Sequence, residues 1–234
     1  IEEVKKYIGK EYASTIGSAY GFVVNKYKMT QKALDLIKNN PNDRRMVMSL
    51  WQNEYLSTGV LEPCVWSHEI DVTGDTLNMY VHQRSCDVPL GLPFNVSQYA
   101  LLMSLYAKSA NLKVGTLSWS IKDAHIYVNQ VDKIKEQMKR AKAIKYIESL
   151  DKERLESMKN YYVRMKDKKS FGNDTFDIET LINAIDYVKN PDKPVLWINE
   201  EVDDFFKYDN SKDCKDIKVL KYKDMGKLSI PVSE

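Results

Sequence analysis

The stretch QRSCDVPLGLPFN, residues 83–95, ends a predicted strand with charged and nucleophilic side chains and then enters a turn-rich loop. Side chains alternate along a strand, so Arg84 and Cys86 are expected on one face and Ser85 and Asp87 on the other, unless the strand bends. A guanidinium binds two phosphate oxygens at once, and a serine hydroxyl can add a further hydrogen bond. The stretch therefore predicts a phosphate site at the end of a strand.

Asn95 closes this stretch, shortly before a helix predicted over residues 97–110. That helix is almost wholly apolar, so it is expected in the core. An asparagine at this place commonly caps a helix. Its amide can also donate and accept hydrogen bonds across the edge of a nucleobase. The residue types alone leave both roles open.

Cys64 lies upstream in LEPCVWSHEID, residues 61–71, directly after a proline. A thiol with an ordinary pKa of roughly 8.5 needs a nearby cation or helix dipole to act as a nucleophile at neutral pH. Most free cysteines are small buried apolar side chains, and alone Cys64 fits that role better. Arg84 is the candidate cation that would change this interpretation.

Two further pairs of polar residues stand out. Arg44 and Arg45 are adjacent, so on a strand they would point to opposite faces and at least one would lie outside the core. His125 and Tyr127 are two residues apart, hence on one strand face. They could bind a hydroxyl group or simply pack as a pair.

The composition is that of a globular protein, with 234 residues of which 43% are hydrophobic and 29% charged. The net charge of +2 argues against nucleic acid as the main partner. Three cysteines and three scattered histidines make a poor metal set, so no metal is expected. The same cysteine usage is typical of a reducing cytoplasm. No apolar run approaches the 18 or so residues of a membrane span.

The patterns predict an α+β fold over 1–234 as a single domain. A helix is expected at 30–40 with Thr30 as its cap, a strand at 44–51, and a hairpin of 64–72 and 76–85. One or two strands are expected in 114–128, and the strands at 193–198 and 215–222 are expected to return to the earlier sheet. Residues 131–191 are expected to form a helical insertion, whose part 131–170 holds thirteen Lys/Arg against seven Asp/Glu.

The segments PNDRR, EPC, QRSCDVPLGLPFN and DAHIYVN, in this order and spacing, resemble the thymidylate synthase family. The resemblance covers roughly residues 16–130 and resumes more weakly at 193–234. It implies a single catalytic domain over 1–234, with a large twisted mixed sheet through which two subunits pair as a homodimer. It also implies the reductive methylation of dUMP to dTMP, with 5,10-methylenetetrahydrofolate as carbon donor and reductant.

The resemblance implies catalytic roles for four residues. Cys64 matches the nucleophile that attacks C6 of the uracil, and Arg84 lies where a cation would stabilise the thiolate. Asn95 matches the side chain that reads the O4/N3 edge of the base. Tyr20 matches a tyrosine associated with removal of the C5 proton.

The remaining matches are binding residues. Those implied for dUMP are Gln83, Arg84, Ser85, Asn95, His125 and Tyr127, together with Arg44 and Arg45 acting from the partner subunit. Those implied for the folate are Asp87, Leu90 and Gly91.

Several positions depart from the family pattern. Val65 follows Cys64 where the family has histidine, and Ile121-Lys122 replaces a pair of glycines. The tail ends in PVSE rather than in small apolar residues, and the family's N-terminal region has no counterpart before Ile1.

These departures keep two alternatives open. One is a dUMP hydroxymethylase, in which water rather than hydride meets the methylene intermediate. The other is a non-catalytic nucleotide- or RNA-binding relative that uses the basic residues of 131–170. The richness in Lys, Asn and Tyr is typical of AT-rich genomes such as those of phages, for which the setting would be the host cytoplasm.

Overall fold

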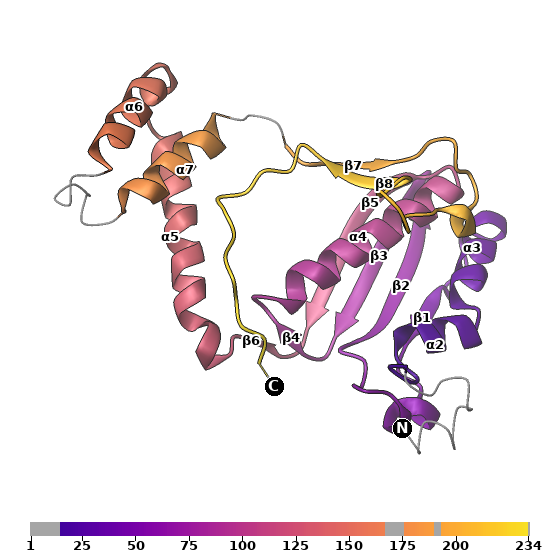
Figure 1. The fold of residues 1–234 in the computed structure, drawn as a ribbon. Coiled ribbons are helices and arrows are strands. Elements are labelled where there is room, and N and C mark those ends of the chain that lie inside the picture. The colour runs from indigo at the N-terminus through magenta and orange to yellow at the C-terminus, as the bar shows by residue number, and fades with distance from the viewer. Residues whose placement is uncertain (1–14, 167–175, 190–192, 234) are drawn as a thin grey trace. The chain divides into compact units, whose positions relative to one another are not determined.

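The computed structural model describes residues 15–166, 176–189 and 193–233 (Figure 1). Two units can be distinguished by their internal contacts: Ile1–His125 with Asp203–Lys207, and Ile126–Val202 with Tyr208–Glu234. The α+β class predicted from the sequence is confirmed. That 131–191 is an insertion into a single catalytic domain stays a prediction.

The first unit is built on a four-stranded mixed sheet in the order β1-β2-β3-β5. Its strands are β1 (Val47–Ser49), β2 (Val65–Thr73), β3 (Thr76–Gln83) and β5 (Lys113–Ile121). The predicted hairpin is present, and Gly74 adopts the positive φ of 62° that its tight turn requires. Helix α4 (Gly91–Ser109) links β3 to β5, which therefore run parallel.

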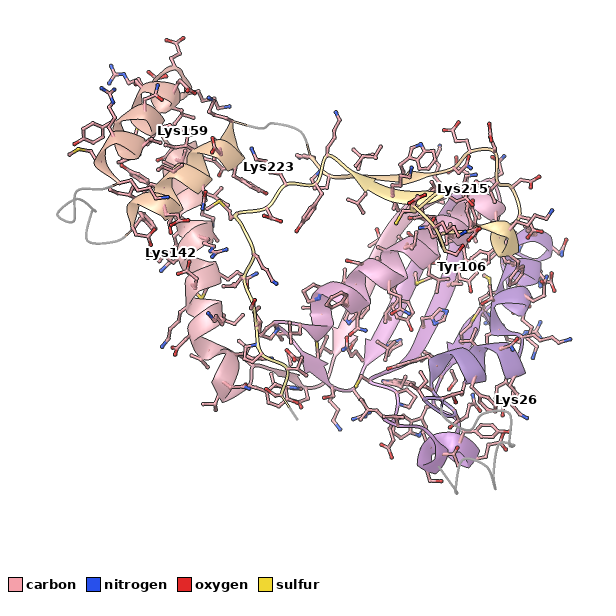
Figure 2. The ribbon with its side chains drawn as sticks, viewed as in Figure 1. Lys26, Tyr106, Lys142, Lys159, Lys215 and Lys223 are labelled. Atoms are coloured by element: carbon pink, nitrogen blue, oxygen red, sulfur yellow. The ribbon has the colours of Figure 1, made fainter. Side chains whose placement is uncertain are left out.

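One face of this sheet is covered and the other carries polar and exposed side chains. Along β3, Leu77, Met79 and Val81 are buried, whereas Tyr80 between them is exposed. Helix α4 packs against the covered face (Figure 1). Tyr106 of α4, labelled in Figure 2, is buried there and stacks on Phe205 with ring centroids 5.3 Å apart. Buried and exposed residues thus alternate along β3 as on a half-covered sheet, and the core of this unit lies between β3 and α4.

Three sequence-based boundaries were wrong. The helix expected at 30–40 is α3 (Met29–Asn39), and its N-cap is Lys28 in the left-handed region rather than Thr30. The strand expected at 44–51 is only β1, because the side chain of Asp43 accepts the backbone N–H of Arg45 and holds the preceding residues in a turn. Helix α4 begins six residues earlier than Ser97, because Pro93 needs no hydrogen-bond partner in a first turn.

Short elements complete the first unit. Helix α2 (Tyr20–Lys26) precedes α3, and β4 (Cys86–Asp87) pairs in parallel with β6 (Ala124–His125). The one or two strands predicted within 114–128 are therefore β5 and β6.

The second unit contains helices α5 (Val131–Glu148), α6 (Leu155–Met165) and α7 (Ile178–Val188), as the pattern predicted. They share a buried apolar cluster that includes Ile147, Leu155 and Ile185. Lys159 of α6, labelled in Figure 2, pairs with Asp186 of α7 at 2.6 Å.

The last strands do not return to the earlier sheet, and that prediction was wrong. β7 (Val195–Ile198) and β8 (Ile217–Leu220) pair with each other in an antiparallel two-stranded sheet. The apolar pattern of a strand does not identify the strand with which it pairs, because pairing between distant segments depends on the whole fold.

Gly115 is expected to tolerate no side chain. It lies at the irregularity between β3 and β5, where an added Cβ would lie 2.8 Å from the carbonyl oxygen of Leu77 and would also meet Asn78. Gly115→Ala should lower the free energy of unfolding by about 1–3 kcal/mol, as overpacking does. The matched control is Gly21→Ala in α2, where a Cβ meets nothing within 4 Å and should stabilise by about 0.5 kcal/mol. Equal effects of the two changes in urea unfolding would contradict this account.

His68 should make stability depend on pH. It is 4% exposed on β2, and burial lowers the pKa of its imidazole from 6.5 to about 4. As the pH falls, His68 is therefore protonated in the unfolded chain before it is protonated in the folded chain. Its contribution to the free energy of unfolding is complete above pH 6.5 and is lost as the pH falls towards 4. Between pH 7 and pH 5 the loss should be about 2 kcal/mol in urea unfolding. A His68→Phe variant should lack this part of the dependence, and an unchanged slope would refute the assignment.

Candidate active site

The candidate residues of the first unit gather where β2 begins and β3 ends. Val65 lies opposite Gln83 in the hairpin register, so the residues just outside the pair, Cys64 and Arg84, are also neighbours. The backbone N–H of Arg84 donates to the carbonyl oxygen of Cys64 at 2.8 Å. The hairpin thus brings the candidate nucleophile and the candidate cation to one end of the sheet.

Cys64 is a partly exposed free thiol whose backbone is held by Tyr20. The Tyr20 hydroxyl accepts the N–H of Cys64 at 2.8 Å and that of Val65 at 3.3 Å. Burial raises the pKa of Tyr20 above 10.0, and the negative charge of the Cys64 thiolate adds to the rise against the opposing effect of the two N–H donors. Tyr20 therefore keeps its proton at neutral pH, and that proton points away from the two amides.

Arg84 is anchored to the loop that carries Cys64. Its Nε donates to the carbonyl oxygen of Pro63 and its Nη2 to that of Glu62, both at 3.0 Å. The guanidinium also lies over the ring of Trp51, 5.7 Å from its centroid. The positive charge of Arg84 is therefore fixed beside Pro63, the residue that precedes Cys64.

The strand bends at Arg84, which is the condition under which the expected alternation does not apply to Arg84 and Cys86. Strand β3 ends at Gln83, Arg84 lies in a bend, and β4 starts at Cys86, so no continuous strand relates the two side chains. Burial raises the pKa of the Cys86 thiol, with Asp87 adding to the rise. Cys86 is 1% exposed and suits a packing role.

Asn95 lies in the second turn of α4, so the alternative role as a helix cap was wrong. Its Oδ1 accepts from the Nε2 of Gln83 at 3.2 Å. The same Gln83 nitrogen donates to the carbonyl oxygen of Ser85 at 2.9 Å, and its Oε1 accepts from the indole N–H of Trp119 at 2.9 Å. Gln83 is 2% exposed, so it contacts Asn95 from within the core.

The predicted folate residues lie around the start of α4. The Asp87 carboxylate accepts the backbone N–H of Leu90 at 3.2 Å. A Cβ on Gly91 would come within 3.6 Å of the Cβ of Asp87 and 3.7 Å of the Oδ1 of Asn95. Both distances are ordinary van der Waals contacts, so Gly91 lies close to the side chains of Asp87 and Asn95.

His125 joins this group through the β4–β6 ladder. It lies opposite Asp87, and its carbonyl oxygen accepts the N–H of Val88 at 3.0 Å. Tyr127 belongs to the second unit, where its backbone N–H donates to the side chain of Gln130 at 3.2 Å.

Arg44 and Arg45 lie away from Cys64 in their own chain. The carbonyl oxygen of Met46 accepts the N–H of Ile70, so Arg45 lies beside a part of β2 about seven residues from Cys64, roughly 20 Å along the strand. Arg45 binds Asp43 through two hydrogen bonds of 2.9 and 2.6 Å. Those bonds lower the pKa of Asp43 to about 2. Arg44 is exposed.

Sequence reasoning missed Trp119 and the carbonyl groups of Glu62 and Pro63. The alternation in LSWSI, residues 117–121, could have placed Trp119 on the covered face of β5. No pattern could have shown that its N–H meets Gln83, because the parallel pairing of β3 and β5 is non-local.

Metal clusters and membrane-spanning helices are both absent from residues 15–166, 176–189 and 193–233. No three His, Cys, Asp or Glu side chains in these ranges gather where they could hold a metal ion. No helix in the same ranges is long and apolar enough to cross a membrane.

Known proteins resemble this chain along most of its length. A family model described as thymidylate synthase matches residues 3–170. A thymidylate synthase of Clostridium beijerinckii is 37% identical over 219 residues, which are 94% of this chain and 64% of that protein. One of Corynebacterium aurimucosum is 43% identical over 110 residues, 47% of this chain and 41% of that protein. The chain thus spans less than two thirds of the length of these two relatives.

A solved structure agrees with these matches. The thermostable thymidylate synthase A from Bacillus subtilis is similar over 99% of this chain and 67% of that chain, with a TM-score of 0.65 and 26% identity. The family model alone covers well over half of the residues. On these grounds, the chain belongs to the thymidylate synthase family.

Proposed function

We propose that this chain methylates dUMP at C5 to give dTMP, with 5,10-methylenetetrahydrofolate as its cosubstrate. The observation that carries the proposal is the setting of Cys64. Its backbone is held by the Tyr20 hydroxyl, and the charge of Arg84 is bound to the two preceding residues. Family membership supplies the substrate class.

Cys64 begins the reaction as the nucleophile. The C5 carbon of uracil is a poor nucleophile until a thiolate adds at C6 and generates an enolate across C5, C4 and O4. Arg84 places a fixed positive charge next to this attack. The amide of Asn95 donates to O4, where the negative charge develops.

Tyr20 acts when the C5 proton leaves. Because its pKa is raised by burial, the hydroxyl is a donor and a relay at neutral pH rather than a base. Its hydrogen bonds to the N–H groups of Cys64 and Val65 orient the phenol oxygen beside the nucleophile. We therefore assign it the positioning of the acceptor for the C5 proton.

The start of α4 suits the cosubstrate. Gly91 lies close to the side chains of Asp87 and Asn95, and a carboxylate there can accept the N–H groups of a pterin ring. When bound, the cosubstrate supplies the one-carbon unit and the hydride. We propose that Asp87, Leu90 and Gly91 hold its ring system. Phosphate and ribose contacts are proposed for Arg84, Ser85, His125 and Tyr127.

We further propose a homodimer that pairs through the uncovered face of the four-stranded sheet. Val47 of β1 and Tyr80 of β3 are 51% and 47% exposed on this face, opposite the one that α4 covers (Figure 1). Exposed apolar residues on a sheet face favour association with a second copy. In this dimer Arg44 and Arg45 bind the phosphate in the partner's site. This fits their distance from Cys64 in their own chain.

The compartment proposed is the cytoplasm. All three cysteines are free thiols, and partly exposed thiols persist in a reducing setting.

One observation supports the dUMP hydroxymethylase as a second candidate. Val65, in place of the family histidine, is 1% exposed and apolar, so the residue after the nucleophile offers no polar group to order water or cosubstrate. A change there could alter the last step, in which hydride or water meets the methylene group.

The test is turnover of dUMP with 5,10-methylenetetrahydrofolate by the full chain. We expect dTMP and dihydrofolate in equal amounts, followed by absorbance and by chromatography of the nucleotide. Hydroxymethyl-dUMP with tetrahydrofolate would instead establish the hydroxymethylase. Nucleotide binding without turnover would favour the non-catalytic relative.

Cys64→Ser should abolish the reaction, because a serine hydroxyl without an adjacent base is a much weaker nucleophile. The expected fall in kcat is roughly 10⁴-fold or more. Cys214→Ser is the matched control, since that thiol is exposed and lies in the second unit. Retention of activity by Cys64→Ser would remove the basis of the proposed mechanism.

Hybrid dimers should reveal the arginines acting in trans. Cys64→Ser and the double variant Arg44→Ala with Arg45→Ala should each be inactive alone. After unfolding and refolding of an equal mixture, a hybrid has one intact site, so activity should return to about a quarter of the wild-type value. If the arginines served their own subunit, every site would remain defective and the mixture would stay inactive.

A further inference from the structure

An asparagine amide does not by itself distinguish uracil from cytosine. With its N–H₂ towards position 4 and its oxygen towards N3–H, the amide matches uracil. Reversed by half a turn, the same amide accepts from the amino group of cytosine and donates to its N3. A site that uses Asn95 to select uracil must therefore hold the amide in one of two nearly isosteric orientations.

The hydrogen bonds behind Asn95 provide this constraint, and they begin at Trp119. An indole N–H can only donate, so the Gln83 atom 2.9 Å away must be the acceptor Oε1. The Nε2 of Gln83 then points the other way and donates to the carbonyl oxygen of Ser85 and to the Oδ1 of Asn95. The Nδ2 of Asn95 is left on the side away from Gln83.

Reversal of either amide would place donor against donor or acceptor against acceptor. A reversed Gln83 would set its N–H₂ against the indole N–H and its oxygen against the Ser85 carbonyl. A reversed Asn95 would set two N–H₂ groups against each other. Because Gln83 is 2% exposed, water does not relieve such a mismatch.

Trp119 is itself firmly placed. It lies opposite Val81 in the parallel pairing of β3 and β5, on the face that α4 covers. The ring of Tyr99, one helical turn after Asn95 on α4, packs edge-on against it with centroids 5.5 Å apart. The same helix and the same sheet therefore position both ends of the chain of hydrogen bonds.

We propose that Trp119 is a positioning residue that sets the preference for uracil over cytosine without contacting the base. It fixes the amide of Gln83, and Gln83 fixes that of Asn95. The proposal rests on the proposed function, since it takes a pyrimidine nucleotide as the ligand of Asn95.

The experiment compares the binding of dUMP, dCMP and deoxyribose 5-phosphate by calorimetry, without folate. The wild-type chain should prefer dUMP to dCMP. Trp119→Phe removes the indole N–H and leaves the Oε1 of Gln83 without a donor. The ratio of the affinity for dUMP to that for dCMP should therefore fall by about tenfold. Affinity for deoxyribose 5-phosphate, which has no base, should stay unchanged.

Tyr99→Phe is the matched control, because it removes a polar group from the same cluster without touching Gln83. It should keep the wild-type ratio. If Trp119→Phe unfolds, β-(3-benzothienyl)alanine at position 119 replaces the N–H by sulfur with nearly the same ring shape and should also lower the ratio.

The outcomes separate two failures. A Trp119→Phe variant with the full wild-type preference, or equal losses in both variants, would overturn the role of Trp119 while dUMP binding by the wild type stands. A wild-type chain that binds deoxyribose 5-phosphate as tightly as dUMP would overturn the proposed function, and this inference with it.

Discussion

The register of the β2–β3 hairpin is the constraint on which the candidate site depends. Val65 opposite Gln83 makes Cys64 a neighbour of Arg84, and the bond between their backbones completes the pairing. A shift of one residue would turn every side chain of β2 to the opposite face. The turn at Gly74 and the buried row of β3 hold the register. Structural residues far from Cys64 therefore decide what lies beside it.

A register shift in the same hairpin also affects which side chains of β2 face the core. Pairing shifts between Val65 and Ser67, so Val65 and His68 both meet residues of the covered face. The covered face of β3 runs from Leu77 through Val81 to Gln83, and it becomes polar only at its last residue. The core thus changes from apolar to hydrogen-bonded towards the end of the sheet that carries Cys64.

Local signals made much of this fold predictable. The hairpin, the helix in the middle of the chain and the helices of 131–191 follow from turn residues and apolar periodicity. The start of α4 and the partners of β7 and β8 were missed, because proline in a first turn and pairing between distant strands leave weak traces in the sequence. Arg84 and Asn95 were proposed from one long motif, and Cys64 from the separate segment EPC upstream of it. Trp119 was not, because its contact with Gln83 arises only when β5 folds beside β3.

The polar end of the core has an energetic consequence. Gln83 and His68 occupy buried positions where apolar side chains would normally contribute more to stability. Gln83 offsets its desolvation with three hydrogen bonds, whereas the neutral imidazole of His68 has no hydrogen-bond partner among the residues that the structure describes. A sheet selected for stability alone would carry an apolar side chain in place of Gln83. The contact of Gln83 with Asn95 is what selection for a rigid, correctly oriented site would produce, since preorganised polar groups act only when their own partners are fixed.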